Sequence, residues 1–118
     1  MTKEDKRIHP RIDALNLIAY ACSDETGQII VQGMGRTLNI SEGGILLETH
    51  VQIESQSDIL LTIGLEDDLV EIKGKVVTST PSETDKFESG IQFLEIGETE
   101  LTILKLYIIA FKDSKRTY

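Results

Sequence analysis

The sequence predicts a mainly β domain, an antiparallel barrel or sandwich, that ends in one α-helix. Apolar and polar residues alternate over several short segments separated by turn-forming residues, which is typical of half-buried strands. Short strands at regular spacing favour a barrel or a sandwich. From residue 97 onward the apolar residues recur at spacings of three and four, which predicts an amphipathic helix. The chain of 118 residues, with 40% hydrophobic and 27% charged residues, has the size and composition of one globular domain.

The predicted strands follow one another closely and occupy residues 11–22, 28–40, 44–53, 57–65, 69–80 and 87–96. The second is rich in β-branched residues but contains Gly33 and Gly35, which predict a bend or a bulge. In the fifth, apolar residues from Val70 to Val76 alternate with charged ones, as in a strand with one buried face. The acidic run "LEDD", residues 65–68, lacks the pattern of a calcium-binding loop, and we expect it to form a solvated hairpin loop.

The C-terminal helix is expected at residues 97–113, with one apolar face formed by Leu101, Leu104, Ile108 and Phe111. Glutamates near its start and lysines near its end match the helix dipole. We expect the helix to pack on the barrel as a lid. Further apolar residues widen its stripe beyond one docking face, so a monomer and a homodimer paired through the helix both remain open.

The distribution of charge separates a basic N-terminal arm from an acidic body. The chain has a net charge of −8, and residues 1–11 carry four cations and two anions, or +2, which leaves −10 for residues 12–118. A body of this charge repels long polyanions such as DNA and acidic membrane surfaces. A small anion held locally by the arm is compatible with it. The alternative is a basic tail that is simply solvated.

The sequence also favours a cytoplasmic location. Cys22 is the single cysteine, so the chain has no internal disulfide, as is usual in a reducing compartment. No apolar run approaches the roughly 20 residues that span a bilayer. The first residues are polar and lack the apolar segment of a secretory signal. We therefore expect no membrane partner.

Two arginines in the arm have a spacing suited to an anion. Arg7 and Arg11 are four residues apart, and Pro10 biases His9 away from the α region, which favours an extended segment. Both side chains would then lie on one face, with Cα atoms about 13 Å apart. Such a pair could clamp a nucleotide-sized ligand, because guanidinium groups bind phosphate bidentately and stack on flat bases. The alternative is a flexible arm with two unrelated arginines.

The junction between the second and third predicted strands has the sequence Asn39-Ile40-Ser41-Glu42-Gly43-Gly44. Asn39 and Ser41 are two residues apart and share a face of a strand, where an amide can read a base edge and a hydroxyl can bind a phosphate. Gly43 and Gly44 permit positive φ and can leave backbone N–H groups free for an anion. The alternative is an ordinary hairpin turn with local hydrogen bonds.

Together the two stretches resemble the PilZ domain family, whose members bind the bacterial second messenger cyclic di-GMP. The segment "KRIHPR" fits the family's R-x-x-x-R motif, and "NISEGG" fits its D/N-x-S-x-x-G motif. The matching positions are Arg7, Arg11, Asn39, Ser41 and Gly44. The segment "SGIQF", residues 89–93, resembles a pattern in a late strand of the family. The resemblance extends from about Lys6 to the end of the helix and is carried by both motifs in the family's order.

The resemblance implies a six-stranded antiparallel β-barrel, a C-terminal helix and an N-terminal arm that is mobile until it wraps around ligand. It also implies that Arg7 and Arg11 contact phosphates and guanine. Lys6 precedes the first motif arginine, a position that influences whether one ligand molecule or a stacked pair is bound, and a cation there favours the pair. The implied binding residues for cyclic di-GMP are therefore Lys6, Arg7, Arg11, Asn39, Ser41, Gly43 and Gly44, with Gly44 keeping room for the ligand.

We expect a receptor without enzymatic activity, cofactor or metal. His9 and His50 have no Cys or His at metal-ligand spacing, and Cys22 has no catalytic partners in the sequence pattern. The expected partners are cyclic di-GMP and a downstream protein that the sequence does not identify. The alternative is a PilZ-type adaptor that regulates a protein without nucleotide. A nucleic-acid-binding barrel is disfavoured by the acidic body and by the presence of only three Phe and three Tyr to stack bases.

Overall fold

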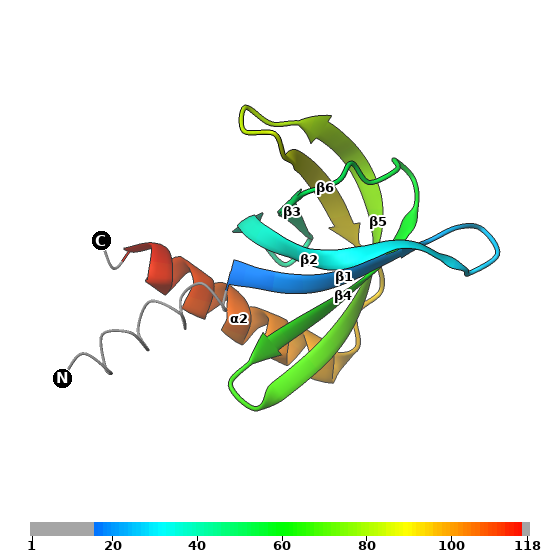
Figure 1. The fold of residues 1–118 in the computed structure, drawn as a ribbon. Helices are drawn as coiled ribbons and strands as arrows, with labels where there is room; N and C mark the ends of the chain where they lie inside the picture. The colour runs from blue at the N-terminus through cyan, green and yellow to red at the C-terminus, as the bar shows by residue number, and fades with distance from the viewer. Residues whose placement is uncertain (1–15, 117–118) are drawn as a thin grey trace.

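The structure, a computed structural model, describes residues 16–116 as a β-barrel followed by a helix (Figure 1). The predicted arm, with Lys6, Arg7 and Arg11, lies outside the described residues. The strands are β1 (Leu17–Ser23), β2 (Ile29–Ile40), β3 (Gly44–Thr49), β4 (Asp58–Leu65), β5 (Asp68–Pro81) and β6 (Phe87–Phe93), and the helix is α2 (Glu98–Arg116). The helix therefore ends three residues beyond the predicted 113.

The strands close into a barrel in the order β1-β2-β3-β6-β5-β4, and every neighbouring pair is antiparallel. This confirms the six-stranded barrel and settles the choice between barrel and sandwich. Closure pairs β1 with β4 and brings β6 between β3 and β5, which are far apart in the sequence. Four strands, β2, β3, β6 and β5, thus form one continuous stretch of the barrel wall.

Three irregularities interrupt the register, and none is at the predicted glycines. At each irregularity one residue of the longer strand has no directly paired residue in its neighbour: Ile30 in the β1–β2 pair, Leu38 in the β2–β3 pair and Val77 in the β5–β6 pair. The expectation of a bulge at Gly33 and Gly35 is wrong, because both pair regularly with β1. Gly35 instead makes room in the barrel, since a Cβ there would lie 2.7 Å from Cγ of Leu47.

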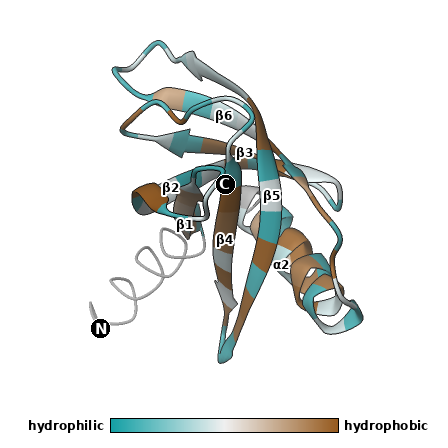
Figure 2. Ribbon diagram, turned by 90° about the vertical axis from the view of Figure 1, so that its right-hand side faces the viewer, coloured by the Kyte–Doolittle hydropathy of each residue, from teal (hydrophilic) through white to brown (hydrophobic). Residues whose placement is uncertain are grey.

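The core is formed by the inward-facing residues of the strands and by one face of α2, which packs against β4 and β5. Figure 2 shows α2 beside β5, with hydrophobic and hydrophilic residues following one another along the helix. Leu104, Tyr107 and Phe111 are buried, and the Tyr107 hydroxyl lies 3.1 Å from Thr37 Oγ1 inside the barrel. The predicted packing of the helix on the barrel is confirmed, with Tyr107 at the centre of the buried face.

Two apolar side chains of α2 remain outside this packing. Leu106 is 48% exposed and Ile109 is 58% exposed on the outer face of the helix. Within residues 16–116, no helix is both long enough and apolar enough to cross a membrane.

Candidate functional site

An open hollow of about 400 Å³ lies on the outer wall of the barrel, over the stretch formed by β2, β3, β6 and β5. Its size is within the range of ligand sites, about 300–1,000 Å³. The lining residues come from the β2–β3 junction and from the facing parts of β5 and β6: Asn39, Ile40, Ser41, Gly43, Gly44, Ile45, Leu46, Val77, Thr78, Gly90, Ile91 and Gln92. The structure therefore brings four of the predicted ligand residues, those of the junction, to one hollow.

The bulge in β2 determines which way Asn39 points. Thr37 is buried in the barrel, and in a regular strand the residue two positions later would face the same way. The extra residue, Leu38, shifts this alternation, so that Asn39 is exposed and Ile40 is buried. A bulge re-aims side chains in this manner. Asn39 consequently reaches the hollow because of the irregularity that precedes it.

The side-chain amide of Asn39 is already oriented. Its Oδ1 accepts a hydrogen bond of 2.9 Å from the backbone N–H of Ile40. Its Nδ2 group has no hydrogen-bond partner among residues 16–116. Because this bond orients the amide, Asn39 can present Nδ2 as a donor to a ligand acceptor such as a base carbonyl, a ring nitrogen or a phosphate oxygen.

The turn after β2 is closed by its own hydrogen bonds. The N–H of Ser41 donates to the carbonyl of Gly44 at 2.9 Å, and the N–H of Gly43 donates to Ser41 Oγ at 3.3 Å. These two backbone donors are therefore engaged, as in the alternative of a turn with local hydrogen bonds, and the N–H of Gly43 is not free for an anion. The Ser41 hydroxyl still has its hydrogen, which can be donated to a phosphate oxygen.

The two glycines of the junction have different roles. Neither uses the positive φ that glycine permits, since Gly27 is the glycine with positive φ in the described part of the chain. A Cβ on Gly44 would overlap the carbonyl oxygen of Ile91 in β6, whereas a Cβ on Gly43 would meet nothing within 4 Å. Gly44 thus allows β3 and β6 to approach closely.

The opposite side of the hollow is formed by residues that motif analysis missed. Val77 is the unpaired residue of β5 and is 45% exposed, and Thr78 follows it. Gly90 leaves space between the strands, since a Cβ there would lie 3.0 Å from Thr78 Oγ1. Gln92 is exposed and carries an amide that both donates and accepts. The segment at residues 89–93 resembles a family pattern, but no signal in the sequence places Val77 or Thr78 beside it.

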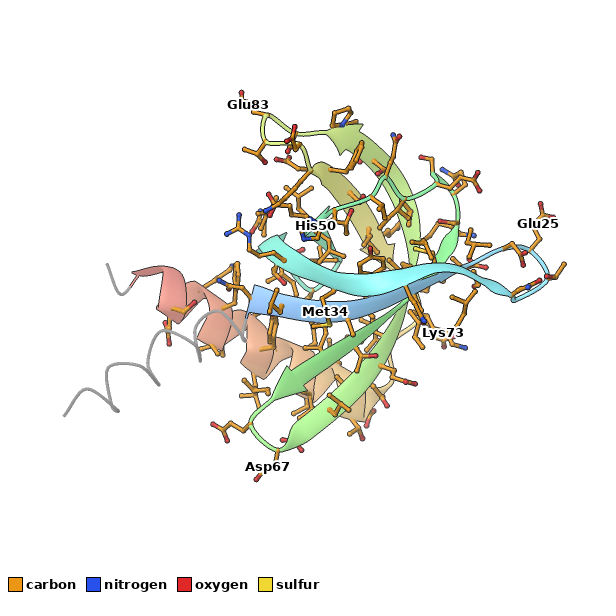
Figure 3. The ribbon with its side chains drawn as sticks, in the orientation of Figure 1. Glu25, Met34, His50, Asp67, Lys73 and Glu83 are labelled. Atoms are coloured by element: carbon orange, nitrogen blue, oxygen red, sulfur yellow. The ribbon has the colours of Figure 1, made fainter. Side chains whose placement is uncertain are left out.

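The hollow has polar groups but no charged side chain in its lining. Glu42 is exposed within the turn at its rim. Other acidic residues stand at the hairpin tips, where Figure 3 shows Glu25, Asp67 and Glu83 pointing into solvent. An anion bound in the hollow must therefore obtain its countercharge from elsewhere. The predicted cations Lys6, Arg7 and Arg11 precede the described residues, so their place relative to the hollow stays a prediction.

Cys22 is enclosed in the barrel core with no exposed surface. Burial raises the pKa of its thiol to about 11, an effect that a hydrogen bond with Ser57 partly offsets. The thiol is therefore protonated at neutral pH and is shielded from substrates. In the described part of the chain, no three His, Cys, Asp or Glu residues are grouped to hold a metal ion.

A family profile described as "PilZ domain" matches residues 5–110, which is most of the chain. No curated protein sequence matches the chain significantly.

Solved structures with the same fold include Bacillus subtilis inhibitor of motility (MotI/DgrA), with a TM-score of 0.60 and 20% identity over 85% of this chain and 48% of that one. MrkH of K. pneumonia in its apo state has a TM-score of 0.61 and 13% identity over 87% of this chain and 48% of that one. A tetrameric PilZ domain protein from Xanthomonas campestris has a TM-score of 0.53 and 13% identity over 99% of this chain and 62% of that one. The chain thus spans about half the length of the first two structures.

Proposed function

The chain belongs to the PilZ domain family, and from that premise we propose that it is a receptor for cyclic di-GMP. The observation that carries the proposal is the position of Asn39, Ser41, Gly43 and Gly44, which all line one open hollow. Their types and spacing match the family's second motif. In this role the protein has no enzymatic activity, and it acts in the bacterial cytoplasm, where an intracellular messenger meets its receptors.

In the proposed complex, the barrel supplies neutral donors and the arm supplies charge. Nδ2 of Asn39 donates to guanine and the Ser41 hydroxyl donates to a phosphate, and Arg7 and Arg11 clamp the phosphates and the second face of a base. The division follows from the uncharged lining, because a ligand with two phosphates needs countercharge that these lining residues lack. Lys6 adds a further cation that favours a stacked pair of ligand molecules.

The affinity expected from these contacts is in the micromolar range. Each charge-assisted hydrogen bond contributes about 1.5–3 kcal/mol, whereas ordering each arm residue costs about 1–2 kcal/mol. Several bonds minus a few ordered residues leave about −8 kcal/mol, which corresponds to a micromolar dissociation constant. Ordering of the arm is then the output of binding, because it changes the surface offered to a downstream protein.

A second candidate function is that of an adaptor that binds a protein without nucleotide. The exposed Leu106 and Ile109 on the outer face of α2 favour it, since neighbouring apolar side chains on one face of a helix suit a protein contact. The same face would serve a homodimer paired through the helix. The two functions differ in whether the protein binds nucleotide in the absence of a protein partner.

The proposal is tested by calorimetric titration of the full-length chain, including its first residues, with cyclic di-GMP. We expect micromolar binding that Arg7→Ala or Arg11→Ala weakens about tenfold to a hundredfold. Asn39→Ala should weaken it about fivefold or more through the lost hydrogen bond. Lys112→Ala, which removes a cation from the exposed face of α2, is the matched control and should leave the affinity unchanged.

Thermal unfolding separates the candidate functions. Cyclic di-GMP should raise the melting temperature of the receptor, and GMP, GTP or a single-stranded oligonucleotide should not. If no nucleotide raises it and calorimetry detects no heat of binding, the receptor proposal fails and the adaptor function is favoured. An affinity unaffected by both arginine substitutions would remove the arm from the binding site.

A further inference from the structure

A row of residues paired in register runs from the hollow across four strands of the barrel. Gln92 of β6 pairs with Gly44 of β3 on one side and with Lys75 of β5 on the other. Lys75 in turn pairs with Asp58 of β4. Gly44 and Gln92 line the hollow, so Lys75 is the next residue in register beyond its edge.

Lys75 is engaged with Asp58 across the β4–β5 gap. Its Nζ lies 2.8 Å from Asp58 Oδ1, and the two side chains are 39% and 57% exposed. An ion pair with this exposure is weak, because water and salt screen it and because two flexible side chains must be fixed. The pair can therefore open at little cost when a better partner for the ammonium group is present.

Lys75 is paired with Asp58 of β4 on one side and with Gln92 of β6 on the other, so its side chain crosses one strand spacing in either direction. Neighbouring strands are about 4.8 Å apart on either side of β5. The side chain that reaches Asp58 on β4 can therefore reach the edge of Gln92 on β6 by changing rotamers. A lysine carries a compact charge on a flexible side chain, so its ammonium group can bind a phosphate from more than one direction. The lining itself has no cation to compete for that phosphate.

We propose that Lys75 leaves Asp58 when cyclic di-GMP binds and holds one phosphate of the ligand at the edge of the hollow over Gln92. This inference rests on the proposed receptor function and adds a cation of the barrel wall to the arginines of the arm. Asp58 has the opposite role. It holds Lys75 in the free protein and so lowers the affinity for ligand.

The signature of this exchange is that the two members of one ion pair change the affinity in opposite directions. In calorimetric titrations of the full-length chain with cyclic di-GMP, Lys75→Met should weaken binding about five- to tenfold. Asp58→Asn should tighten it about two- to threefold, since the ammonium group is released beforehand. In the Lys75→Met background, Asp58→Asn should have no further effect. A purely structural ion pair would give losses for both.

Lys73→Met is the matched control. Lys73 is exposed on the same face of the same strand, two residues farther from the hollow, and its removal changes the net charge by the same amount (Figure 3). We expect it to change the affinity less than twofold. Melting temperatures of all the variants without ligand should agree closely, because both members of the pair are exposed.

The outcomes distinguish this inference from the function on which it rests. If the unaltered protein does not bind cyclic di-GMP, both are wrong. If it binds and Lys75→Met weakens binding no more than Lys73→Met, the receptor function stands and the role of Lys75 is refuted. Unchanged or weaker binding by Asp58→Asn would likewise refute the exchange.

Discussion

Substitution of Gly44 by alanine tests how the site is built. Gly44 begins β3 and pairs with Gln92 of β6, and a Cβ on it would overlap the carbonyl oxygen of Ile91. That oxygen belongs to the backbone of β6, which is paired with a strand on each side, so it cannot move aside as the end of a flexible side chain can. We therefore expect Gly44→Ala to push apart the first paired residues of β3 and β6. The hydrogen bond of 2.9 Å from Phe93 N–H to the Gly43 carbonyl lies beside this contact and should weaken as well.

The change in the free energy of unfolding of Gly44→Ala follows from two opposing effects. Forcing extra atoms into a packed site destabilises the folded state by about 1–3 kcal/mol. Replacing glycine lowers the entropy of the unfolded chain, and this stabilises the protein by about 0.4–1 kcal/mol. The free energy of unfolding should fall by about 1–2 kcal/mol, which lowers the melting temperature by about 4–12 °C. Gly43→Ala is the matched control, since its Cβ meets nothing within 4 Å and its φ is not positive. Only the favourable entropy term applies to it.

Urea denaturation of the two variants and the unaltered protein, followed by circular dichroism, measures these differences directly. Amide hydrogen exchange should show faster exchange at the start of β3 and the end of β6 in Gly44→Ala alone. Equal stability of Gly43→Ala and Gly44→Ala would contradict the expected overlap, because it would mean that β3 and β6 have space for a side chain at this pair. Lost binding in a stable Gly44→Ala protein would instead favour the glycine's predicted role in leaving room for ligand.

Three further predictions concern the core and the rim of the hollow. Tyr107→Phe removes the partner of the buried Thr37 hydroxyl, so the free energy of unfolding in urea should fall by about 1–2 kcal/mol; an unchanged midpoint would contradict this. The raised pKa of Cys22 gives stability that is fully present below its ordinary value of 9.0 and is lost as the pH rises to about 11, because the unfolded chain ionises first. This loss should reach about 2–3 kcal/mol, and Cys22→Ala should flatten the decline in urea titrations over that range. Glu42→Gln removes a negative charge at the rim of the hollow, so calorimetry should show cyclic di-GMP bound about two- to fivefold more tightly, most clearly at low salt; weaker binding would assign the carboxylate a favourable contact.

Local patterns in the sequence were sufficient for the elements of the fold. Alternation along each strand reports which face is buried, and the change to spacings of three and four after residue 97 reports a helix. Both signals depend on residues that are neighbours in the chain. The same is true of Asn39 and Ser41, which belong to one short motif and do lie together at the hollow.

Features that depend on the register between strands arise only in the closed barrel. Nothing near Leu38 or Val77 in the sequence marks these residues as unpaired, because a bulge forms where two strands of different curvature must stay paired around a closed barrel. The bulge at Leu38 turns Asn39 outward, and the bulge at Val77 brings Thr78 to the opposite wall of the hollow.

The six strands, the helix and the motif at the β2–β3 junction can be predicted from the sequence, since each is encoded by the period or the type of adjacent residues. Only closure of the barrel placed β6 between β3 and β5, and so set Gln92 and Lys75 beside Gly44. Pairing between distant strands is fixed by the fit of the whole wall, which no single segment contains.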